Sequence, residues 1–241
     1  RAVRKEPMKR SFIALIAITF LATMAVDAGA AQRGTRPAEV SHGFFKTVFG
    51  LEYGGHADAR RVKRFVRPVR FHISDRAGQN RTGAARRFVA SLPKRIKHFD
   101  GRVVSSAQSA NFRILIVKRK DFAAVVAREL QADAIAMNAR CLVGVTTDGG
   151  RIRNSVAVIV GDDDYLFSRC LIEETLQGLG PMNDNPSLTN SVFNDRSKLA
   201  TFTPFDQAIL NVLYHPSVRP GMTKRQARSV LPHAMHDLGY R

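Results

Sequence analysis

Three polar side chains follow one another along a stretch that otherwise reads as a buried helix. Residues 165–179 carry apolar side chains around nearly the whole helical circumference, which predicts a central, buried helix. Glu173, Glu174 and Gln177 share one arc of that helix at about 100° per residue. A buried carboxylate without a partner is energetically expensive. These three groups are therefore expected to line a cleft, bind a cation or pair with basic side chains.

The spacing around this arc resembles the extended zinc-peptidase motif H-E-x-x-H-x-x-G-x-x-H. Glu174 stands at the catalytic Glu of that motif, so the resemblance implies that Glu174 is a general base. The ligand positions and the turning glycine fall on Glu173, Gln177, Gly180 and Asn183, with Asp184 beside the last as an alternative. Residues 191–193 stand where such peptidases place their Met-turn. The resemblance implies an α+β, zincin-like single domain with a small mixed sheet, a central active-site-type helix and a C-terminal helix.

The ligand set departs from that of the zinc peptidases, because both helix histidines are replaced. Zinc in proteins is held by His, Cys, Asp or Glu, whereas Gln177 and Asn183 offer amide oxygens. An oxygen-only set of Glu173, Gln177, and Asn183 or Asp184 suits Ca²⁺, Mg²⁺ or Mn²⁺ better than zinc. Classical zinc catalysis is therefore not expected, and the cofactor that this set would accept is a hard divalent cation.

Three interpretations of the helix follow. In the first, the chain is a degenerate metallopeptidase-like protein without classical zinc catalysis. As a non-catalytic binding module it would take an extended peptide in its cleft by strand addition, or an anionic envelope polymer on a basic surface. In the second, the chain is an active hydrolase that uses an unusual oxygen-ligated metal or none, with Glu174 as the base. In the third, the chain is unrelated to zinc peptidases. Without a metal, the simplest role of Glu173 and Glu174 is to form buried salt bridges with arginines.

A second resemblance covers residues 60–220, which are similar to a family of exported bacterial proteins known as a domain of unknown function. The shared features are short motifs spread along the chain. They are Val48-Phe49-Gly50-Leu51-Glu52-Tyr53, the EExxQxLGxxND run from Glu173, Ser191-Val192-Phe193-Asn194-Asp195, Leu213-Tyr214-His215-Pro216 and Pro220-Gly221-Met222. This resemblance implies export and no particular activity.

Strands and helices are predicted to alternate before the polar helix. Alternation predicts a strand at 69–73, and an apolar run predicts one at 111–117 that is buried on both faces. A short strand is predicted at 103–105, and turn residues at 147–150 predict a hairpin with strands at 142–146 and 152–160. Helical spacing predicts helices at 82–98, after 121 and at 203–213, and a capping pattern at Thr223 predicts one more short helix. Asp121, the run Asp162–Asp164 and Thr203 are the predicted N-terminal caps. Residues 182–200 read as an irregular loop.

The N-terminus has the order of a secretory signal. Lys9 and Arg10 precede an apolar run at 12–26, and the small residues Ala28-Gly29-Ala30 follow it. The run is shorter than the ~20 residues that span a bilayer, so cleavage near Ala30 is expected and an uncleaved anchor is the alternative. The chain is therefore predicted to be exported, into the periplasm or the medium.

Four parts are predicted along the chain. Residues 1–30 form the signal peptide, 31–59 an N-terminal lead-in, 60–222 the zincin-like domain and 223–241 a C-terminal helix and tail. The beginning of the lead-in, 31–43, is predicted to be flexible. Four apolar side chains at helical spacing, Phe44, Phe45, Val48 and Phe49, are expected to dock on the domain.

Two cysteines, Cys141 and Cys170, are present in the sequence. In an oxidising compartment a single pair of thiols most simply forms a disulfide. Two buried free thiols are the alternative, and metal ligation is disfavoured because the pair lacks CxxC spacing.

The chain is strongly basic. It has 38 Lys+Arg against 20 Asp+Glu, a net charge of +18 and a pI near 11.0, which favours anionic partners. The basic residues cluster at Arg60, Arg61, Lys63, Arg64, Arg67 and Arg70, at Arg86, Arg87, Lys94, Arg95 and Lys97, and at Lys118–Lys120. For an exported protein the expected anions are envelope polymers, lipid head groups or extracellular DNA. Intracellular nucleic acid is not expected, since no nucleic-acid module is recognised and stacking aromatics are few, with Trp 0 and Tyr 4.

The histidines do not complete a metal site by sequence. His215 follows the last core helix and is a weak candidate for the cleft. His233 and His236 share one helical face by spacing, but they fall in a tail that is expected to be unstructured.

Overall fold

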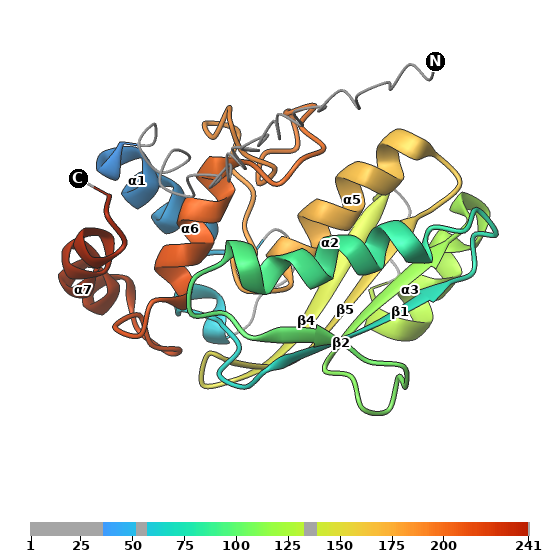
Figure 1. Cartoon of the computed structure of the whole chain (residues 1–241), viewed down its shortest axis with the longest axis horizontal. Coiled ribbons are helices and arrows are strands. Elements are labelled where there is room, and N and C mark those ends of the chain that lie inside the picture. Colours follow the sequence, from blue (N-terminus) through green and yellow to red (C-terminus); the bar gives the residue numbers. More distant parts are fainter. Residues whose placement is uncertain (1–35, 52–56, 133–138, 241) are drawn as a thin grey trace, which may run out of the picture.

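A mixed sheet with helices on both faces forms the centre of the molecule (Figure 1). The computed structural model describes residues 36–51, 57–132 and 139–240. The predicted signal peptide, residues 1–30, lies outside the described residues. The fold is a single α+β domain with a mixed sheet, as the sequence predicted.

Five strands make up the sheet, in the order β2-β1-β3-β5-β4. They are β1 (Val69–Asp75), β2 (Gly101–Val103), β3 (Phe112–Val117), β4 (Cys141–Asp148) and β5 (Arg151–Val160). Strands β2, β1, β3 and β5 run parallel, whereas β4 pairs antiparallel with β5 and forms one edge. Gly149 and Gly150 turn the β4–β5 hairpin with φ of 56° and 78°, a conformation that favours glycine.

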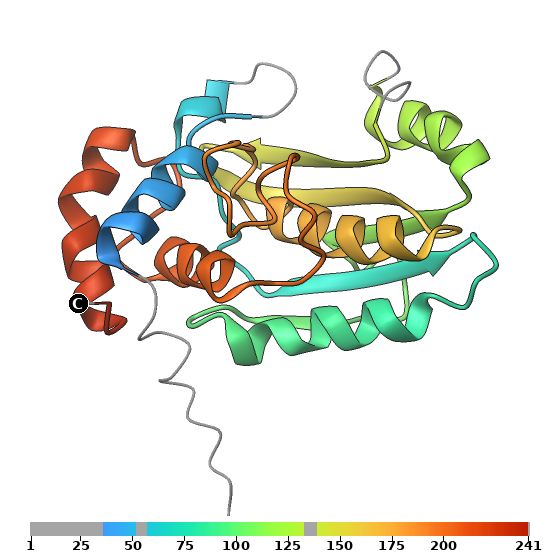
Figure 2. The same ribbon diagram turned by 90° about the horizontal axis from the view of Figure 1, so that it is seen from above.

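The two faces of the sheet bury different apolar clusters. Helices α2 (Thr82–Arg95) and α5 (Asp164–Gln177) cover one face (Figures 1 and 2), where inward residues of alternate strand positions form the main core. Helix α3 (Phe122–Leu130) covers the other face toward the carboxyl ends of the parallel strands, over a smaller cluster that includes Leu115, Val117 and Val158. The amino-terminal half of that second face carries Arg70, His72 and Arg113 in neighbouring register.

Three helices gather at one end of the sheet: α1 (Pro37–Thr47), α6 (Pro204–Tyr214) and α7 (Lys224–Asp237) (Figure 2). Short 3-10 turns, η1 (Ala57–Arg60) and η2 (Arg119–Asp121), complete the described elements. The predicted docking of the lead-in is confirmed, because Val40, Phe44 and Val48 are fully buried in the main core. The prediction of a flexible segment at 31–43 is wrong from Pro37 onward, because α1 begins there and packs into that core.

The predicted caps hold at three helices. Asp163 accepts from the backbone of Leu166 at 2.7 Å, and both Thr203 and Thr223 form capping boxes. Asp121 was predicted to cap α3, and this is wrong in detail. A 3-10 turn leads directly into α3, so Asp121 has helical backbone angles and its side chain makes no capping hydrogen bond.

The C-terminal region is more regular than the sequence suggested. Helix α7 extends to Asp237 and buries Ala227, Leu231 and Ala234, so His233 and His236 lie on a helix and not in an unstructured tail. Pro232 lies inside this helix. None of the helices in the described part of the chain has both the length and the apolarity of a membrane span.

Two members of the first basic cluster, Lys63 and Arg64, form hydrogen bonds within the fold. Lys63 is 1% exposed, and its ammonium donates to the carbonyls of Val48 at 2.9 Å and Arg61 at 3.2 Å, with three more carbonyls within 3.4 Å. Arg64 donates from one guanidinium nitrogen to the carbonyls of Leu213, His215 and Val218 at 2.8–3.0 Å. The ammonium of Lys63 and the guanidinium of Arg64 are therefore used by the fold, and the anion-binding surface expected from this cluster does not include them.

Candidate functional site beside helix α5

Helix α5 presents its polar arc at a pocket of about 460 Å³. Three segments line this pocket: residues 139–141 at the start of β4, residues of α5 from Tyr165 to Glu174, and residues 195–198 of the irregular loop. Glu173, Glu174 and Gln177 are all buried, as the helical wheel predicted for their neighbours. Because α5 is apolar on most sides, the fold can bury it completely only by enclosing these polar groups as well.

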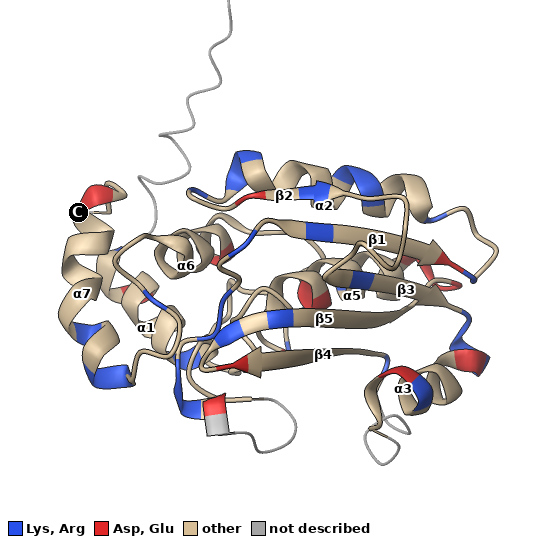
Figure 3. Ribbon diagram, turned by 90° about the horizontal axis from the view of Figure 1, so that it is seen from below, with Lys and Arg blue, Asp and Glu red and all other residues tan. Residues whose placement is uncertain are grey.

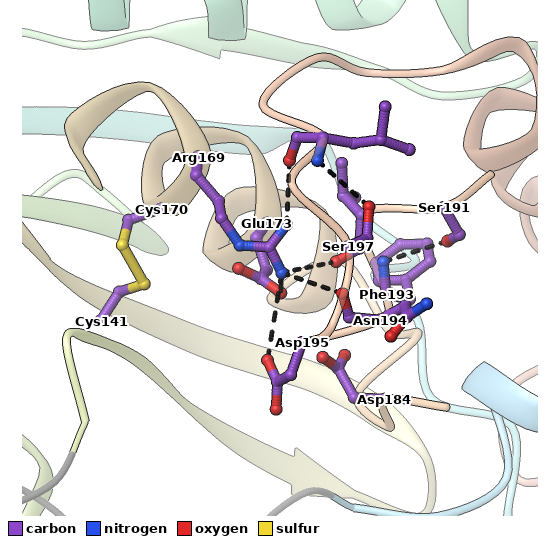
Figure 4. Close-up of polar contacts among 12 residues, drawn as sticks. Cys141, Arg169, Cys170, Glu173, Asp184, Ser191, Phe193, Asn194, Asp195 and Ser197 are labelled. Carbon is purple, nitrogen blue, oxygen red and sulfur yellow. Dashed lines mark hydrogen bonds and ion pairs between the residues drawn. A yellow bond between two sulfur atoms is a disulfide. The ribbon is translucent and has the colours of Figure 1, made fainter. Parts of the chain in front are cut away.

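A buried ion pair occupies the centre of this arc (Figure 4). Arg169, one turn before Glu173, donates to its carboxylate at 2.8 Å, and the two side chains are only 9% and 6% exposed. The same guanidinium donates to the carbonyls of Leu199 at 2.9 Å and Asn194 at 3.2 Å, and lies 4.0 Å from Asp195. The arginine thereby fastens the irregular loop to α5 and neutralises a buried carboxylate. The predicted salt bridge of Glu173 with an arginine is confirmed.

The other two predicted ligand positions, Gln177 and Asn183, lie in different surroundings. Gln177 donates its side-chain amide to Asp184 at 2.8 Å, so these two residues are brought together below the end of α5. Asn183 turns the other way, toward α1: its side chain donates to the carbonyl of Lys46 at 2.7 Å, and its backbone donates to the carbonyl of Thr47. Of the two alternatives for the last ligand position, Asp184 lies near Glu173 and Asn183 lies away from it.

Carboxylate oxygens of Glu173, Asp184 and Asp195 lie within 4.8 Å of one another. A second group joins Glu173 and Glu174 with the sulfur of Cys141, but that sulfur is held in a disulfide and is no thiolate ligand. This donor set does not fit a structural or catalytic zinc ion, because it holds no histidine and its central carboxylate already binds a guanidinium. An oxygen-ligated hard cation remains compatible with the three carboxylates.

The disulfide predicted between Cys141 and Cys170 is present, with Cα atoms 5.7 Å apart (Figure 4). It joins the first residue of the edge strand β4 to the middle of α5, beside the pocket. The wall of the pocket is therefore covalently tied to its floor. Closing a loop of this length stabilises the fold by about 3–4 kcal/mol in the chain-entropy model.

The loop below α5 is irregular but tightly held. Ser191 donates to Asp206 of the α6 capping box at 2.6 Å, and the backbone of Phe193 donates back to the Ser191 hydroxyl at 3.0 Å. Ser191, Phe193 and Asn194 are buried. Burial raises the pKa of the Asp206 carboxyl, although the hydroxyls of Ser191 and Thr203 oppose that shift. Polar side chains replace secondary structure here in satisfying the buried backbone.

Sequence reasoning missed three residues of this site. Arg169 was detectable, since an Arg four residues before a Glu on a helix is a standard pair. Tyr165 at the rim is 48% exposed, and only the fold reveals that it lines the pocket. Asp195 reaches the pocket through the irregular loop, and the sequence of that loop has no periodic pattern that predicts its path. His215, the weak candidate, lies instead between the rings of His98 and His233, with its Nε2 3.5 Å from Asp237 of α7.

The comparison with known proteins agrees with the second resemblance. No curated protein matches the chain. A family model described as protein of unknown function (DUF2927) matches residues 37–233, which span the lead-in helix, the sheet, the pocket and most of α7. The chain therefore belongs to the DUF2927 family.

Proposed function

We propose that this chain is an exported, metallopeptidase-like protein whose cleft binds an extended peptide and does not hydrolyse it through zinc. One observation carries the proposal: the Arg169 guanidinium is buried against Glu173, at the position where the zinc-peptidase motif has its first ligand. A fixed positive charge thus neutralises the buried carboxylate from within the chain. A divalent ion bound to the same carboxylate would lie close to that guanidinium and be repelled by it.

The arrangement around α5 supports the metallopeptidase-like part of the proposal. The helix lies against the hairpin with an antiparallel edge strand, β4, beside its pocket. Gly180 follows the helix with φ 138°, where an added Cβ would lie 2.2 Å from the carbonyl oxygen of Lys63, so the glycine is needed for the sharp turn. The loop then returns below α5 and buries residues 191–193. These are the roles that the resemblance assigns to the turning glycine and the Met-turn.

Peptide binding is supported by the edge strand and the rim of the pocket. Strand β4 pairs with β5 on one side only among the described strands, so its other edge offers backbone groups to an extended chain. Tyr165 is one of two large side chains of apolar character that are exposed in the described residues. An exposed tyrosine at the rim of a pocket is typical of a residue that anchors a bound peptide.

Charge at the pocket predicts what kind of peptide side chain enters it. Glu173, Glu174 and Asp195 lie on its floor and side, and Arg140, Arg196 and Lys198 lie around it. Both signs are present within one cavity of about 460 Å³, so a polar side chain with donors and acceptors is favoured over a large apolar one.

Export is supported by the disulfide together with the signal-like N-terminus. A structural disulfide persists in the oxidising periplasm or outside the cell and is rare in a reducing cytosol. The bond between Cys141 and Cys170 therefore agrees with the expected route of the chain.

A peptide-binding assay on the exported full chain tests the proposal. Immobilised libraries of extended peptides are expected to retain the protein, and Tyr165→Ala is expected to weaken the best peptide about tenfold or more, as anchoring aromatics do. Tyr165→Phe keeps the ring and serves as the matched control, with affinity close to that of the unaltered chain. Peptides that stay intact in the complex support binding without hydrolysis. Cleavage that is lost in Glu174→Ala would overturn that part.

A hydrolase with an oxygen-ligated cation is the second candidate, because the carboxylates of Glu173, Asp184 and Asp195 converge within 4.8 Å. Metal analysis of the exported chain, purified without chelator, separates the two candidates. A stoichiometric divalent ion that is lost in Asp184→Asn would favour the hydrolase. Peptide binding that is unchanged in chelator would favour the binding protein.

A further inference from the structure

A second pocket, of about 300 Å³, lies at the amino ends of the parallel strands, away from α5. Its walls come from the segment before β1, the loop before β3 and the start of β5. Three arginines line it, Arg67, Arg70 and Arg153, and no acidic side chain is among its described lining residues. Figure 3 shows the surrounding face, where Lys and Arg positions (blue) lie on strands β1, β3 and β5. The pocket is thus a cavity with concentrated positive charge.

Hydrogen bonds of Asn111 connect the segments that line the pocket. The side chain of Asn111 accepts from the backbone of Arg70 at 2.6 Å and donates to the carbonyl of Pro68 at 3.1 Å. The backbone of Asn111 also bonds to Arg70 and to Ser155. One residue therefore pins the starts of β1, β3 and β5 together, and Arg70 is positioned by backbone bonds on both sides.

The arginines are held without being neutralised. The Nε of Arg70 donates to the carbonyl of Ser109, a contact that orients the guanidinium without cancelling its charge. Within the described part of the chain, neither Arg67 nor Arg70 has an ion pair with an acidic side chain. Arg153 pairs with Asp148 across the hairpin, but that pair is exposed, and exposed pairs are weak enough for an anion to displace.

We propose that this pocket binds a phosphorylated sugar unit of an anionic glycan, with Arg67, Arg70 and Arg153 around the phosphate. Guanidinium groups match the oxygens of a phosphate in a bidentate manner. A cavity of about 300 Å³ exceeds the volume of a phosphate alone, which leaves room for a sugar ring. Gln108 and Asn154 are exposed at its edge and bring amide groups of the kind that bind hydroxyls.

The lining favours this ligand over nucleic acid and over a lipid surface. Base stacking needs an open aromatic face, and Phe65, the aromatic residue of the lining, is only 3% exposed. Membrane docking needs an apolar patch that inserts between lipids, and Val66 is the one large exposed apolar side chain at this pocket. A polar ligand with one strong negative charge fits the remaining groups.

Calorimetric titration of the exported full chain at low ionic strength tests the proposal. Glucose 1-phosphate is expected to bind more tightly than inorganic phosphate, and glucose is expected not to bind. The variant Arg67→Gln, Arg153→Gln is expected to lower the affinity for glucose 1-phosphate about tenfold or more. The matched control, Arg86→Gln, Arg87→Gln, removes the same charge from exposed positions on α2 and is expected to leave affinity within about twofold.

Several results would overturn the proposal. Equal losses in the two double variants would show that net charge, and not the pocket, attracts the ligand. If inorganic phosphate bound as tightly as glucose 1-phosphate, the pocket would not recognise the sugar. A thymidine oligonucleotide, or vesicles of phosphatidylglycerol, that bind through Arg67 and Arg153 while glucose 1-phosphate does not would assign the pocket to those ligands instead. Because both altered side chains are exposed, the variant is expected to fold.

Discussion

Two groups of arginines in this protein use the same side chain in opposite ways. Arg169 lies inside the pocket at α5, bound to Glu173 and to carbonyls of the loop, with hardly any exposed surface. Arg67 and Arg70 lie at an open pocket, and neither has an acidic partner in the described chain. The closed group is satisfied by the protein itself, whereas the open group retains charge for something outside it.

The difference follows from desolvation. A buried guanidinium must recover from the protein what it loses from water, so a closed site accumulates carboxylates and carbonyls until it is neutral. An exposed guanidinium stays hydrated and needs no such partner. The net charge therefore exceeds the positive charge that is available for binding. Lys63, Arg64 and Arg169 bind groups of the protein itself. The exposed arginines produce the positive potential at the surface.

The largest effect is expected when the closed group is opened. Arg169→Ala leaves Glu173 buried without its cation and removes the bonds to Leu199 and Asn194. Breaking a buried pair in this way costs about 3–5 kcal/mol of unfolding free energy. Arg67→Ala, at an exposed position, is expected to change it by less than about 0.5 kcal/mol. Urea unfolding of the two variants measures both values.

A double variant checks the reason for that loss. Arg169→Met, Glu173→Met removes both charges at once and is expected to regain most of the stability, because buried ion pairs can be replaced by apolar side chains at little cost. If the double variant is as unstable as Arg169→Ala, the carbonyl contacts of the guanidinium, and not its charge, hold the loop.

Loss of the disulfide is expected to affect the two pockets unequally. Cys141→Ser, Cys170→Ser opens a link across 29 residues and is expected to lower the unfolding free energy by about 3–4 kcal/mol. Peptide affinity at α5 is expected to fall, because the bond joins the β4 wall of that pocket to α5 at its floor. Binding of glucose 1-phosphate at 25 °C is expected to persist. Equal losses at both sites would indicate global unfolding instead.

Lys63 is a buried cation in the same basic cluster as Arg67. Burial lowers the pKa of its ammonium group to about 8, whereas the pKa of an unfolded lysine is about 10.4. Between those values the unfolded chain binds the extra proton, so the contribution of Lys63 to stability rises as the pH increases from 8 to 10. The unfolding free energy of the unaltered chain, minus that of Lys63→Met, is expected to increase over this range.

The exposed lysine Lys94 offers a control for that pH series. Lys94→Met removes the same group without disturbing a buried site, so any trend common to both variants belongs to the rest of the chain. A difference for Lys63 that falls as the pH rises would mean that its carbonyl partners hold the charged form more strongly than burial opposes it.

Local patterns predicted much of the fold. Alternation at 69–73 and an apolar run at 111–117 correctly predicted strands, Gly149 and Gly150 turn the hairpin, and Asp163 and Thr203 cap their helices. Each of these features depends on a residue and its near neighbours. The disulfide was also predictable, because only two cysteines were present and pairing needed no register.

Partners that are distant in the sequence could not be predicted in the same way. Lys63 and Arg64 look like solvated charges until α1 and the end of α6 bring carbonyls to them. Asn183 looks like a ligand until α1 takes its side chain. Asp184 and Asp195 reach Glu173 through a loop with no period. In each case the chemistry of the residue was readable, and the neighbour that decides its role was not.

The smallest change is expected to be visible only as binding. Asp148 is exposed and pairs with Arg153, whose guanidinium holds the pKa of that carboxyl below its usual value. Asp148→Asn removes a competitor for Arg153 without opening a buried site, so thermal stability is expected to stay the same. Affinity for glucose 1-phosphate is expected to rise, by about twofold to fivefold at low salt, and the gain should shrink as salt screens both interactions. If the affinity does not change, Arg153 contributes nothing to ligand binding. The positive charge that binds the phosphate then comes from Arg67 and Arg70 alone.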